Sequence, residues 1–586
     1  MKKTLLRTVL RREVVALTRV GVIVLAIFLI LLEFGYQSNT GTERLLDEAS
    51  YDLVVAAAFV TLGSLLRSWL RQHAVRRAEV LWLLAAVALI LIRPLHNTLW
   101  DDLGRWPHMA FLILFIFIEL SRLELGRNST LLNPALLFTA SFILIISIGA
   151  ALISLPKMTT RPVTLIDALF TSTSAVCVTG LTVLDVQHDL THAGQWLLMI
   201  LIQLGGLGVM TFTSFFAFFF KGRSSLEEQL RIRDLSNTSL SGARGFIVRV
   251  ILFTLAVELV GALFIFYSVP QSMFATIGDR AFFSMFHAIS AFNNAGFSTL
   301  TDGLHEPVLR FNYALMWIIA FLIIFGGLGF GIIFNFSQYM RSWFRARVKK
   351  LFTGVPCQRY PRLVNLSSKL ALISTLALIV IGTVAMLLFE RDGVLEEHAG
   401  WWGRFSVAFF SGITPRTAGF NVVNTGALHV PSLMITLLLM YIGASPGSTG
   451  GGIKTTTFAI ATLNIFGSAR GRKRIEYGGR EVSNVSVRRA FATIVLSLIF
   501  LGISVTVVSS LEHGLGLLPV AFECFSAYGT VGLSMGITGE LSEAARLVLV
   551  VVMFVGRVSA LTLLVGVLRQ VQSSNYRYPK EDILIN

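Results

Sequence analysis

The sequence predicts an all-α polytopic membrane protein. Four tandem membrane–pore-loop–membrane repeats surround one pore in a pseudo-fourfold arrangement, and about four further transmembrane helices precede them. Composition, apolar segments and a motif that recurs four times lead to this fold. Of the 586 residues, 54% are hydrophobic and 14% are charged, and the mean hydropathy is +0.73. Soluble domains carry about 25% charged residues. The composition therefore excludes a soluble enzyme, a disordered chain and a fibrous repeat.

The N-terminal extension, residues 1–125, contains four candidate membrane spans. They are the apolar segments 16–32, 51–66, 80–92 and 109–120. A membrane-spanning helix needs about 20 apolar residues, so the last two segments are short for a span. The first segment has the position of a signal peptide, but no small-residue cleavage site follows residue 32. We therefore expect it to remain in the protein as an anchor.

Eight longer apolar segments follow residue 130 and pair into the four predicted repeats. The segments are 131–155, 196–220, 246–267, 314–334, 370–389, 433–466, 491–509 and 547–568. The repeats that contain them span 130–221, 243–340, 366–468 and 487–570, and residues 571–586 form a tail. The segment 433–466 is interrupted, so the third repeat is expected to have a broken second span.

Lysine and arginine set the orientation of the spans, because they are enriched in cytoplasmic loops. Basic clusters alternate with acidic connections, and the basic ones lie at 2–12, 67–77, 221–249, 341–362, 470–489 and 569–580. Twelve spans with both termini in the cytoplasm fit this alternation. The net charge of +16 then marks the cytoplasmic side and does not indicate a nucleic-acid partner. The alternative is that these basic loops bind a cytosolic protein.

A glycine-centred motif occurs four times outside the main spans. The copies read Ser174-Ala-Val-Cys-Val-Thr-Gly-Leu181, Ser290-Ala-Phe-Asn-Asn-Ala-Gly-Phe297, Ile413-Thr-Pro-Arg-Thr-Ala-Gly-Phe420 and Ser526-Ala-Tyr-Gly-Thr-Val-Gly-Leu533. A short amphipathic segment precedes each copy, at 163–174, 279–290, 401–412 and 517–526, and a full span follows it. About 10–12 helical residues cross half a bilayer, so each short segment predicts a re-entrant helix. One such glycine commonly marks only a helix end, but four matched copies indicate a repeat.

Carbonyl groups arranged in a ring at these loops would suit a cation that has lost its water. Carbonyl oxygens replace the hydration shell, glycine adopts the required backbone angles at least cost, and a helix ending before the loop points its negative end at the ion. The predicted selectivity filter consists of Cys177, Val178, Thr179, Gly180, Asn293, Asn294, Ala295, Gly296, Arg416, Thr417, Ala418, Gly419, Gly529, Thr530, Val531 and Gly532. We expect K⁺ at the backbone carbonyls of Val178, Thr179, Asn294, Ala295, Thr417, Ala418, Thr530 and Val531.

The residues beside the glycines lead to further expectations. Val178 and Thr179 in the first loop, and Thr530 and Val531 in the fourth, have β-branched side chains, which we expect to hold an extended backbone. The residue three positions before the glycine differs in each loop: Cys177, Asn293, Arg416 and Gly529. The ring is therefore asymmetric, and we expect weaker ion discrimination than in a strict fourfold filter. The Arg416 guanidinium is expected to hold loop carbonyls behind the filter.

The four motifs resemble those of the Trk/Ktr/HKT superfamily of potassium transporters, most like the bacterial KtrB-type membrane subunits. The resemblance covers about 130–570, and it maps the selectivity glycines of the superfamily to Gly180, Gly296, Gly419 and Gly532. It implies K⁺ as the transported ion, sodium dependence, a homodimer in the bacterial inner membrane, and a cytosolic nucleotide-binding regulatory ring of the KtrA/TrkA type. The sequence departs from the superfamily in its N-terminal extension, since the Ktr type lacks these four spans and the Trk type has two.

The interrupted span contains five glycines and one proline within residues 443–452. A continuous helix does not tolerate this composition, and broken helices at membrane depth occur where they line a water-filled pathway. The resemblance places an intramembrane gate here, below the filter. The predicted gate residues are Gly443, Gly447, Gly450, Gly451, Gly452, Lys454 and Arg557. A plain connector between two helices is the alternative. A phosphate-binding loop is excluded by its spacing, because Ile453 separates the last glycine from Lys454.

Arg557 lies about eleven residues into the last span, roughly 16 Å deep at 1.5 Å per residue. A cation at that depth costs about 2.5–3.5 kcal/mol or more unless it faces water or a partner. We expect it to face the pathway and to bind carbonyls of the broken loop, which the resemblance also implies. The alternative is that its side chain reaches the inner surface. Among other polar residues at membrane depth, Glu258 is expected in helix packing, and Glu523 and His287 in support of the filter loops or in the vestibule.

The predicted function is potassium uptake through a gated, carbonyl-lined pore, driven by the electrochemical gradient. Three alternatives remain open: a stoichiometric secondary cation symporter, a regulated non-selective monovalent cation channel, and a sensor or scaffold with a blocked pore. A membrane enzyme is not indicated, because the sequence has no HExxH, no GxSxG and no histidine cluster. Cys177, Cys357 and Cys524 are too few for a disulfide framework, and no organic cofactor is expected.

Overall fold

The computed structural model describes residues 40–70, 77–92, 134–219, 242–353, 365–472 and 474–567, with single residues between 21 and 36 and between 107 and 115. The chain divides into two compact units: Met1–Leu131 with Ser154–Pro162, and Leu132–Ile153 with Val163–Asn586. The predicted tail, the basic segment 2–12, residues 221–241 of the segment 221–249 and residues 354–362 of the segment 341–362 lie outside the described residues.

The first unit contains two described helices of the N-terminal extension. Helix α2 (Thr40–Leu70) and helix α3 (Arg77–Ile92) pack against each other, and they contain the predicted spans 51–66 and 80–92. Their core includes Val54, Ala57 and Ala86. The predicted spans 16–32 and 109–120 lie largely outside the described residues.

The second unit consists of four groups of helices, each with a long helix, a short helix and a further span, which is broken into two helices in the second, third and fourth groups. The groups are α6 (Pro134–Ile153), α7 (Leu165–Val176) and α8 (His192–Phe219); α10 (Gly242–Ser268), α11 (Ile277–Asn293), α12 (Tyr313–Leu328) and α13 (Phe330–Thr353); α14 (Leu366–Phe389), α15 (Gly400–Ile413), α16 (Val430–Tyr441) and α17 (Thr455–Ala469); and α18 (Asn484–Leu511), α19 (Leu517–Gly529), α20 (Glu543–Val558) and α21 (Ala560–Val567). A small antiparallel pair, β1 (Glu476–Tyr477) and β2 (Arg480–Glu481), connects α17 to α18.

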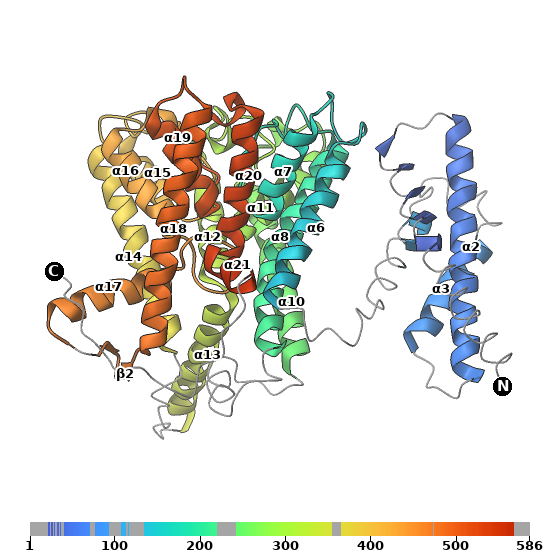
Figure 1. Ribbon diagram of the computed structural model, residues 1–586, viewed down its shortest axis with the longest axis horizontal. Helices are drawn as coiled ribbons and strands as arrows, with labels where there is room; N and C mark the ends of the chain where they lie inside the picture. Colours follow the sequence, from blue (N-terminus) through green and yellow to red (C-terminus); the bar gives the residue numbers. More distant parts are fainter. Residues whose placement is uncertain are drawn as a thin grey trace. The chain divides into compact units, whose positions relative to one another are not determined.

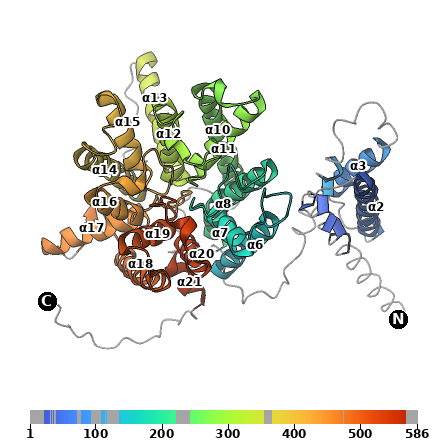
Figure 2. The same ribbon diagram turned by 90° about the horizontal axis from the view of Figure 1, so that it is seen from above.

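The groups follow one another around a common centre when the second unit is seen from above (Figure 2). The helix after each short helix packs against the short helix of the next group: α8 against α11, α12 against α15, and α16 against α19. Helix α20 packs against α7, so the last group closes onto the first. This cyclic contact pattern brings the ends of the four short helices toward one region.

The short helices coincide with the predicted re-entrant segments and run from the surface into the interior. Their first turns carry exposed apolar side chains: Leu165, Ile277, Trp401 and Leu517 are each more than two thirds exposed, whereas their last turns are buried. Thr164 and Thr276 cap two of these helices by accepting the backbone N–H of Asp167 and Asp279. A hydroxyl cap supplies the partner that the first turn of a helix lacks.

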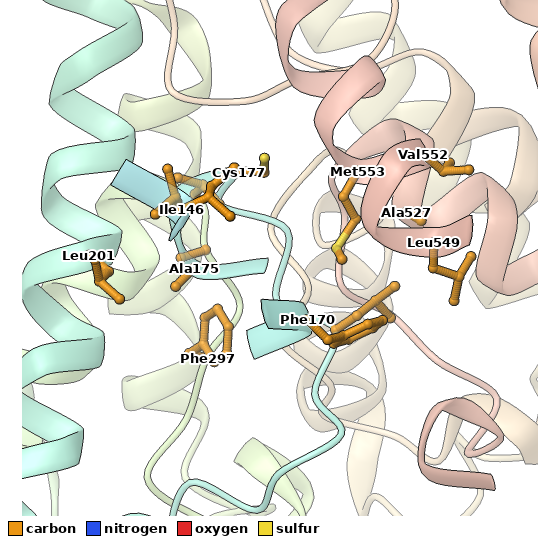
Figure 3. Close-up of a cluster of buried hydrophobic side chains, with 14 of the residues drawn as sticks. Ile146, Phe170, Ala175, Cys177, Leu201, Phe297, Ala527, Leu549, Val552 and Met553 are labelled. Carbon is orange, nitrogen blue, oxygen red and sulfur yellow. The ribbon is translucent and has the colours of Figure 1, made fainter. Parts of the chain in front are cut away.

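Apolar contacts join the first and last groups into one core. Phe170 and Ala175 of α7 belong to one buried cluster with Leu549, Val552 and Met553 of α20, although nearly 400 residues separate the two helices in the chain, and Figure 3 shows Phe170 on the side of Leu549 and Met553. All five side chains are almost fully buried. The core thus fixes the closure of the ring of helices.

Two predicted spans are broken in ways the sequence analysis did not anticipate. Segment 314–334 divides at Gly329, where α12 and α13 meet at 98°, and segment 547–568 divides at Ser559. Both residues have positive φ, +81° and +73°, which ends a right-handed helix. Figure 1 shows α13 leaving the bundle below α12. Within the described part of the chain, Val248–Ser268, Leu366–Phe389 and Asn484–Leu511 are long and apolar enough to cross a membrane as single helices, and the bent α12–α13 pair passes as a fourth candidate.

Candidate functional site

The four motif glycines form a closed ring of backbone contacts. A Cβ atom placed on Gly296 would lie 2.8 Å from the carbonyl oxygen of Ala418 and 2.9 Å from Cα of Gly419. The same relation holds around the ring, since a Cβ on each glycine would strike the carbonyl oxygen of the residue before the next one: Gly180 on Ala295, Gly419 on Val531, and Gly532 on Thr179. A side chain at any of these four positions would therefore displace a neighbouring loop.

Each loop contains a second residue with left-handed backbone, two positions before the glycine. These residues are Val178, Asn294, Thr417 and Thr530, with φ between +50° and +69°, and the glycines have φ between +72° and +94°. The expectation of an extended backbone at Val178 and Thr530 is therefore wrong. A left-handed β-branched residue costs about 1–3 kcal/mol and persists only where its surroundings impose it. In this chain the surroundings are the other three loops and the segment beneath them.

A hydroxyl group secures each loop to the end of its short helix. Ser174 and Ser526 accept the backbone N–H of Gly180 and Gly532 at 3.0 and 3.1 Å. Ser290 and Thr414 instead donate to the carbonyl oxygens of Phe297 and Phe420, at 2.8 and 2.6 Å. The hydroxyls therefore fix the loop on either side of the glycine.

The side chains three positions before the glycines are anchored behind the loops. Cys177 is buried in the apolar core, and the Asn293 side-chain amide donates to Glu258 on α10 at 2.9 Å. Arg416 lies 3.4 Å from both the carbonyl and the hydroxyl oxygen of Thr375 on α14. The carbonyl that Arg416 contacts therefore belongs to the spanning helix α14 and not to a motif loop. The expectation that Arg416 holds loop carbonyls is wrong.

The residues between α16 and α17, 442–454, form a non-helical loop, which confirms the predicted interruption at 443–452. We call this segment the interrupting loop. Its ends meet at a β-bridge between Ile442 and Ile453. The backbone N–H of Gly451 donates to the Thr530 hydroxyl at 3.0 Å, and the Thr449 hydroxyl lies 3.3 Å from the side-chain amide of Asn294.

Gly450 completes these contacts of the interrupting loop, because a Cβ there would collide with the Thr417 hydroxyl. The loop therefore touches three of the four left-handed residues of the ring, in the second, third and fourth motif loops.

Two cationic side chains bind the carbonyls of the interrupting loop. Lys454 Nζ donates to the carbonyl oxygen of Gly450 at 2.6 Å, and the Arg557 guanidinium donates to that of Thr449. Arg557 also donates to the carbonyl oxygen of Gly205 on α8 at 2.9 Å. The expected contact between Arg557 and the broken loop is confirmed. The alternative of a side chain reaching the surface is excluded, because Arg557 is only 6% exposed.

The glycine before Arg557 has counterparts in the first two helix groups, and they show which position Arg557 occupies. Gly205, Gly326 and Gly556 each lie so close to the end of a short helix that a Cβ would strike the carbonyl oxygen of Val176, Phe292 or Tyr528. The next residue is Gly206 in the first group, Gly327 in the second and Arg557 in the fourth. The fourth group therefore places a guanidinium where the first two have no side chain.

His287 and Glu523 occupy matching positions, nine residues before Gly296 and Gly532. His287 Nε2 lies 2.9 Å from the Ser298 hydroxyl, and Glu523 accepts hydrogen bonds from the hydroxyls of Ser534 and, at 3.1 Å, Thr538. Ser298 and Ser534 follow the glycines by two residues. These groups support the segments that leave the ring, as expected.

Asp185 links the connections that follow the first two motifs, outside the spanning helices. The Thr301 hydroxyl donates to Asp185 Oδ2 at 2.8 Å, and His188 Nδ1 lies 3.0 Å from the same oxygen. Partial burial raises the pKa of Asp185, but the hydrogen bonds from His188, Thr301 and the backbone together lower this pKa by more than burial raises it. The pKa of Asp185 therefore lies below its usual range.

Comparison with known proteins assigns this architecture to a family. The family model TrkH, described as a cation transport protein, matches residues 110–577. The chain belongs to the TrkH family. The superfamily resemblance is thus confirmed, and the match begins about 20 residues before the segment to which the motifs assigned it.

Individual relatives of this TrkH-family chain are transport proteins. It is 37% identical to Ktr system potassium uptake protein B of Bacillus subtilis over 457 residues, which cover 77% of this chain and 96% of that protein. It is 35% identical to the potassium/sodium uptake protein NtpJ of Enterococcus hirae over 463 residues, 78% of this chain and 97% of the relative. The crystal structure of the potassium transporter TrkH from Vibrio parahaemolyticus shares the fold, with a TM-score of 0.59 and 18% identity, over 83% of this chain and 97% of that one.

Proposed function

We propose that this protein carries K⁺ into a bacterial cell through a gated pore whose selectivity filter is the ring of four motif loops. The observation that carries the proposal is the closed cycle in which each motif glycine lies against the carbonyl of the next loop. Relatives that are 35–37% identical over most of their length are named potassium uptake and potassium/sodium uptake proteins, which supports K⁺ as the ion and makes Na⁺ a second candidate.

The backbone of the ring suits an ion that has lost its water. Positive φ at the glycine and again two residues earlier turns the peptide groups of each loop, so that consecutive carbonyls can face one side. Carbonyl rings of this kind replace a hydration shell. The C-terminal ends of α7, α11, α15 and α19 lie at the loops, and their partial negative charge favours a cation there. In this proposal K⁺ binds the carbonyls of the two residues before each glycine.

The segment between α16 and α17 acts as the gate in this proposal. It lies against the left-handed residues Asn294, Thr417 and Thr530, and Arg557 and Lys454 hold its carbonyls. The N–H groups of Ser445 and Thr449 in this segment donate to the carbonyl oxygens of Gly327 and Gly326 on α12, at 3.1 and 3.4 Å. Displacing the segment therefore requires that these backbone hydrogen bonds, as well as the side-chain contacts, be exchanged for water. A positive charge at Arg557 beside the pathway also raises the barrier to cations until the segment moves.

The cyclic order of the helices favours a channel-like pore over a secondary symporter. Symporters of the inverted-repeat type bind their substrate between two halves related by a twofold axis. Here four groups with the same order of elements contact one another in sequence, α8 to α11, α12 to α15, α16 to α19 and α20 to α7. The proposal also includes a homodimer in the inner membrane, both termini in the cytoplasm, a cytosolic nucleotide-binding ring on the basic loops, and transport without catalysis.

The test is ion flux through the purified full-length chain in liposomes. We expect K⁺ and Rb⁺ flux to exceed Na⁺ flux, and Gly296→Ser and Gly419→Ser to remove this preference. Gly502→Ser is the matched control, because a Cβ at Gly502 meets no atom within 4 Å. Equal selectivity in the wild type and both ring variants would contradict the filter.

A second variant separates a closed gate from a protein without a pore. If the wild type is silent, deletion of residues 443–452 should release K⁺ flux; silence of both proteins would overturn the proposal. Flux whose reversal potential follows a gradient of a second ion would instead support the symporter. Flux without preference among K⁺, Rb⁺ and Na⁺ would support the non-selective channel.

A further inference from the structure

A carboxyl group is buried at mid-span of α10, away from the ring itself. Glu258 lies near the centre of the apolar stretch Val248–Ser268 and is only 4% exposed. A carboxylate in such a segment is costly unless it has partners, and its presence indicates a functional role. Neither the filter nor the gate proposed above uses it.

Glu258 belongs to a closed triangle of three polar side chains from three helices. Its Oε1 accepts from Asn293 Nδ2 of α11 at 2.9 Å, and its Oε2 accepts from Gln203 Nε2 of α8 at 3.1 Å. The third side is the hydrogen bond from Asn293 Nδ2 to Gln203 Oε1, at 2.8 Å. The triangle thus joins the first and second helix groups directly behind the second motif loop.

The hydrogen-bond directions in this triangle are fixed by a backbone carbonyl. Asn293 Nδ2 also lies 3.0 Å from the carbonyl oxygen of Ile289, which can only accept. The nitrogen of Asn293 must therefore face Ile289, Gln203 and Glu258. The side-chain oxygen of Gln203 then accepts a hydrogen bond from Asn293, and its side-chain nitrogen donates one to Glu258. The two hydrogens of Asn293 Nδ2 are shared among three acceptors, the carbonyl oxygen of Ile289, Gln203 Oε1 and Glu258 Oε1. Each carboxyl oxygen of Glu258 thus lies opposite an amide nitrogen.

The triangle meets the filter at the residue where α11 ends. Asn293 is the last residue of α11, and the next residue, Asn294, has left-handed backbone and contacts the interrupting loop. Gly206 leaves space for Asn293, because a Cβ there would collide with Asn293 Oδ1. The carboxylate therefore fixes the point from which the second loop departs.

The corresponding position of the third loop carries the opposite charge. Arg416, like Asn293, precedes its motif glycine by three residues, and it is buried against α14. A buried positive charge raises the energy of a nearby cation, and it does so strongly where water is excluded. An ionised Glu258 would place a negative charge behind the neighbouring loop and oppose this effect.

We propose that Glu258 is a positioning residue that sets ion selectivity: through Asn293 its carboxylate holds the second filter loop and favours a cation in the ring. This inference rests on the function proposed above, because it requires the four loops to be the filter.

The test compares full-length variants in the liposome assay, with KM for K⁺, maximal flux and K⁺/Na⁺ preference as readouts. Glu258→Gln keeps the shape of the side chain but presents an N–H₂ group to N–H donors. We expect its KM for K⁺ to rise and its K⁺/Na⁺ preference to fall, each about tenfold, as expected for the loss of one charge-assisted hydrogen bond. Thr254→Val, one turn away on α10 and also buried, should behave as wild type.

A charge-exchange variant distinguishes this role from simple packing. Glu258→Gln combined with Gln203→Glu moves the carboxylate to α8, where it can accept from Asn293 Nδ2 and from the new amide at position 258, and it leaves the bond from Asn293 to Ile289 in place. We expect the double variant to recover most of the K⁺/Na⁺ preference, whereas Gln203→Glu alone places two carboxylates in contact and should lose it.

Two results would overturn the inference. One is wild-type KM and selectivity in Glu258→Gln; the other is a folded double variant, monodisperse and with wild-type thermal stability, that recovers nothing. If Glu258→Gln fails to fold, the double variant alone carries the test. Gly296→Ser is measured beside them as a test of the filter itself. If Gly296→Ser loses selectivity while Glu258→Gln keeps it, only this inference fails. If Gly296→Ser also keeps selectivity, the proposed filter fails.

Discussion

The guanidinium of Arg557 donates a hydrogen bond to the carbonyl oxygen of Thr449, although 108 residues separate them in the chain. The same guanidinium donates to the carbonyl oxygen of Gly205 on α8. One buried cation therefore ties the interrupting loop of the third group to helices of the fourth and first groups. A segment held in this way changes position only when the hydrogen bonds of Arg557 are exchanged.

Arg557→Ala should open the pathway. The substitution removes two hydrogen bonds from a charged donor, each contributing about 1.5–3 kcal/mol, and we expect at least about a tenfold rise in K⁺ flux. Arg557→Lys keeps the charge but loses the forked geometry and should give an intermediate flux. The measurement is ⁸⁶Rb⁺ or K⁺ uptake into liposomes at equal protein content. Unchanged flux in Arg557→Ala would remove this residue from the gate.

Thr530→Val should loosen the contact between gate and filter. The Thr530 hydroxyl accepts the backbone N–H of Gly451, and valine keeps the β-branched shape but cannot accept. A neutral hydrogen bond contributes about 1 kcal/mol, so we expect about a fivefold increase in flux. Thr506→Val on α18, where the hydroxyl bonds only within its own helix, is the control. A flux ratio of one between the two variants would show that this bond does not restrain the segment.

Ser559→Gly should keep or raise the stability of the protein, whereas Gly329→Ser should lower it. Ser559 and Gly329 both have positive φ at a helix break. Glycine relieves the backbone strain at residue 559. We therefore expect an unchanged or higher thermal unfolding temperature, with a gain of up to about 1 kcal/mol in the free energy of unfolding. Serine at 329 has the unfavourable φ, and its Cβ would lie 2.9 Å from the Gly447 backbone, so this variant should be destabilised. A lower unfolding temperature of Ser559→Gly than of the wild type, both measured in detergent, would contradict the prediction that the backbone is strained at residue 559.

Asp185→Asn should lower stability at neutral pH but not in acid. Because the pKa of Asp185 in the folded protein lies below its usual range, its contribution is fully present above about pH 4, the ordinary value, and is lost as pH falls through the folded pKa. The difference in unfolding temperature between wild type and Asp185→Asn should therefore be constant from about pH 5 to 8 and shrink below about pH 4. A difference that grows toward acid would contradict this sign.

Local features of the chain were predictable where composition decides the backbone. The glycine and proline content of residues 443–452 predicted the interruption between α16 and α17, and the four short apolar segments coincide with α7, α11, α15 and α19. The depth of Arg557 predicted carbonyl partners in the broken loop, because a buried guanidinium requires acceptors. The repeat boundaries and the filter assignment themselves remain predictions.

Other features escaped prediction because their cause is distant in the chain. Nothing near Val178 or Thr530 favours left-handed backbone, and β-branching argues against it; the neighbouring loops impose it. The bends at Gly329 and Ser559 lie in uninterrupted apolar segments, and Ser559 gives no composition signal. Arg416 and Glu258 could be recognised as unusual, but their partners, Thr375, Gln203 and Asn293, could not be named from spacing.

The sequence by itself determined the membrane class of this protein, the fourfold recurrence of its motif, and the place where one span must break, because hydropathy, glycine content and chain spacing act locally. Only the tertiary structure decided how the loops meet, which residues carry positive φ, and which carbonyls Arg557 binds. Those outcomes depend on contacts between helices that are as much as 350 residues apart, as Gly205 and Arg557 are. Such contacts exist only once α20 has closed the ring of helices against α7.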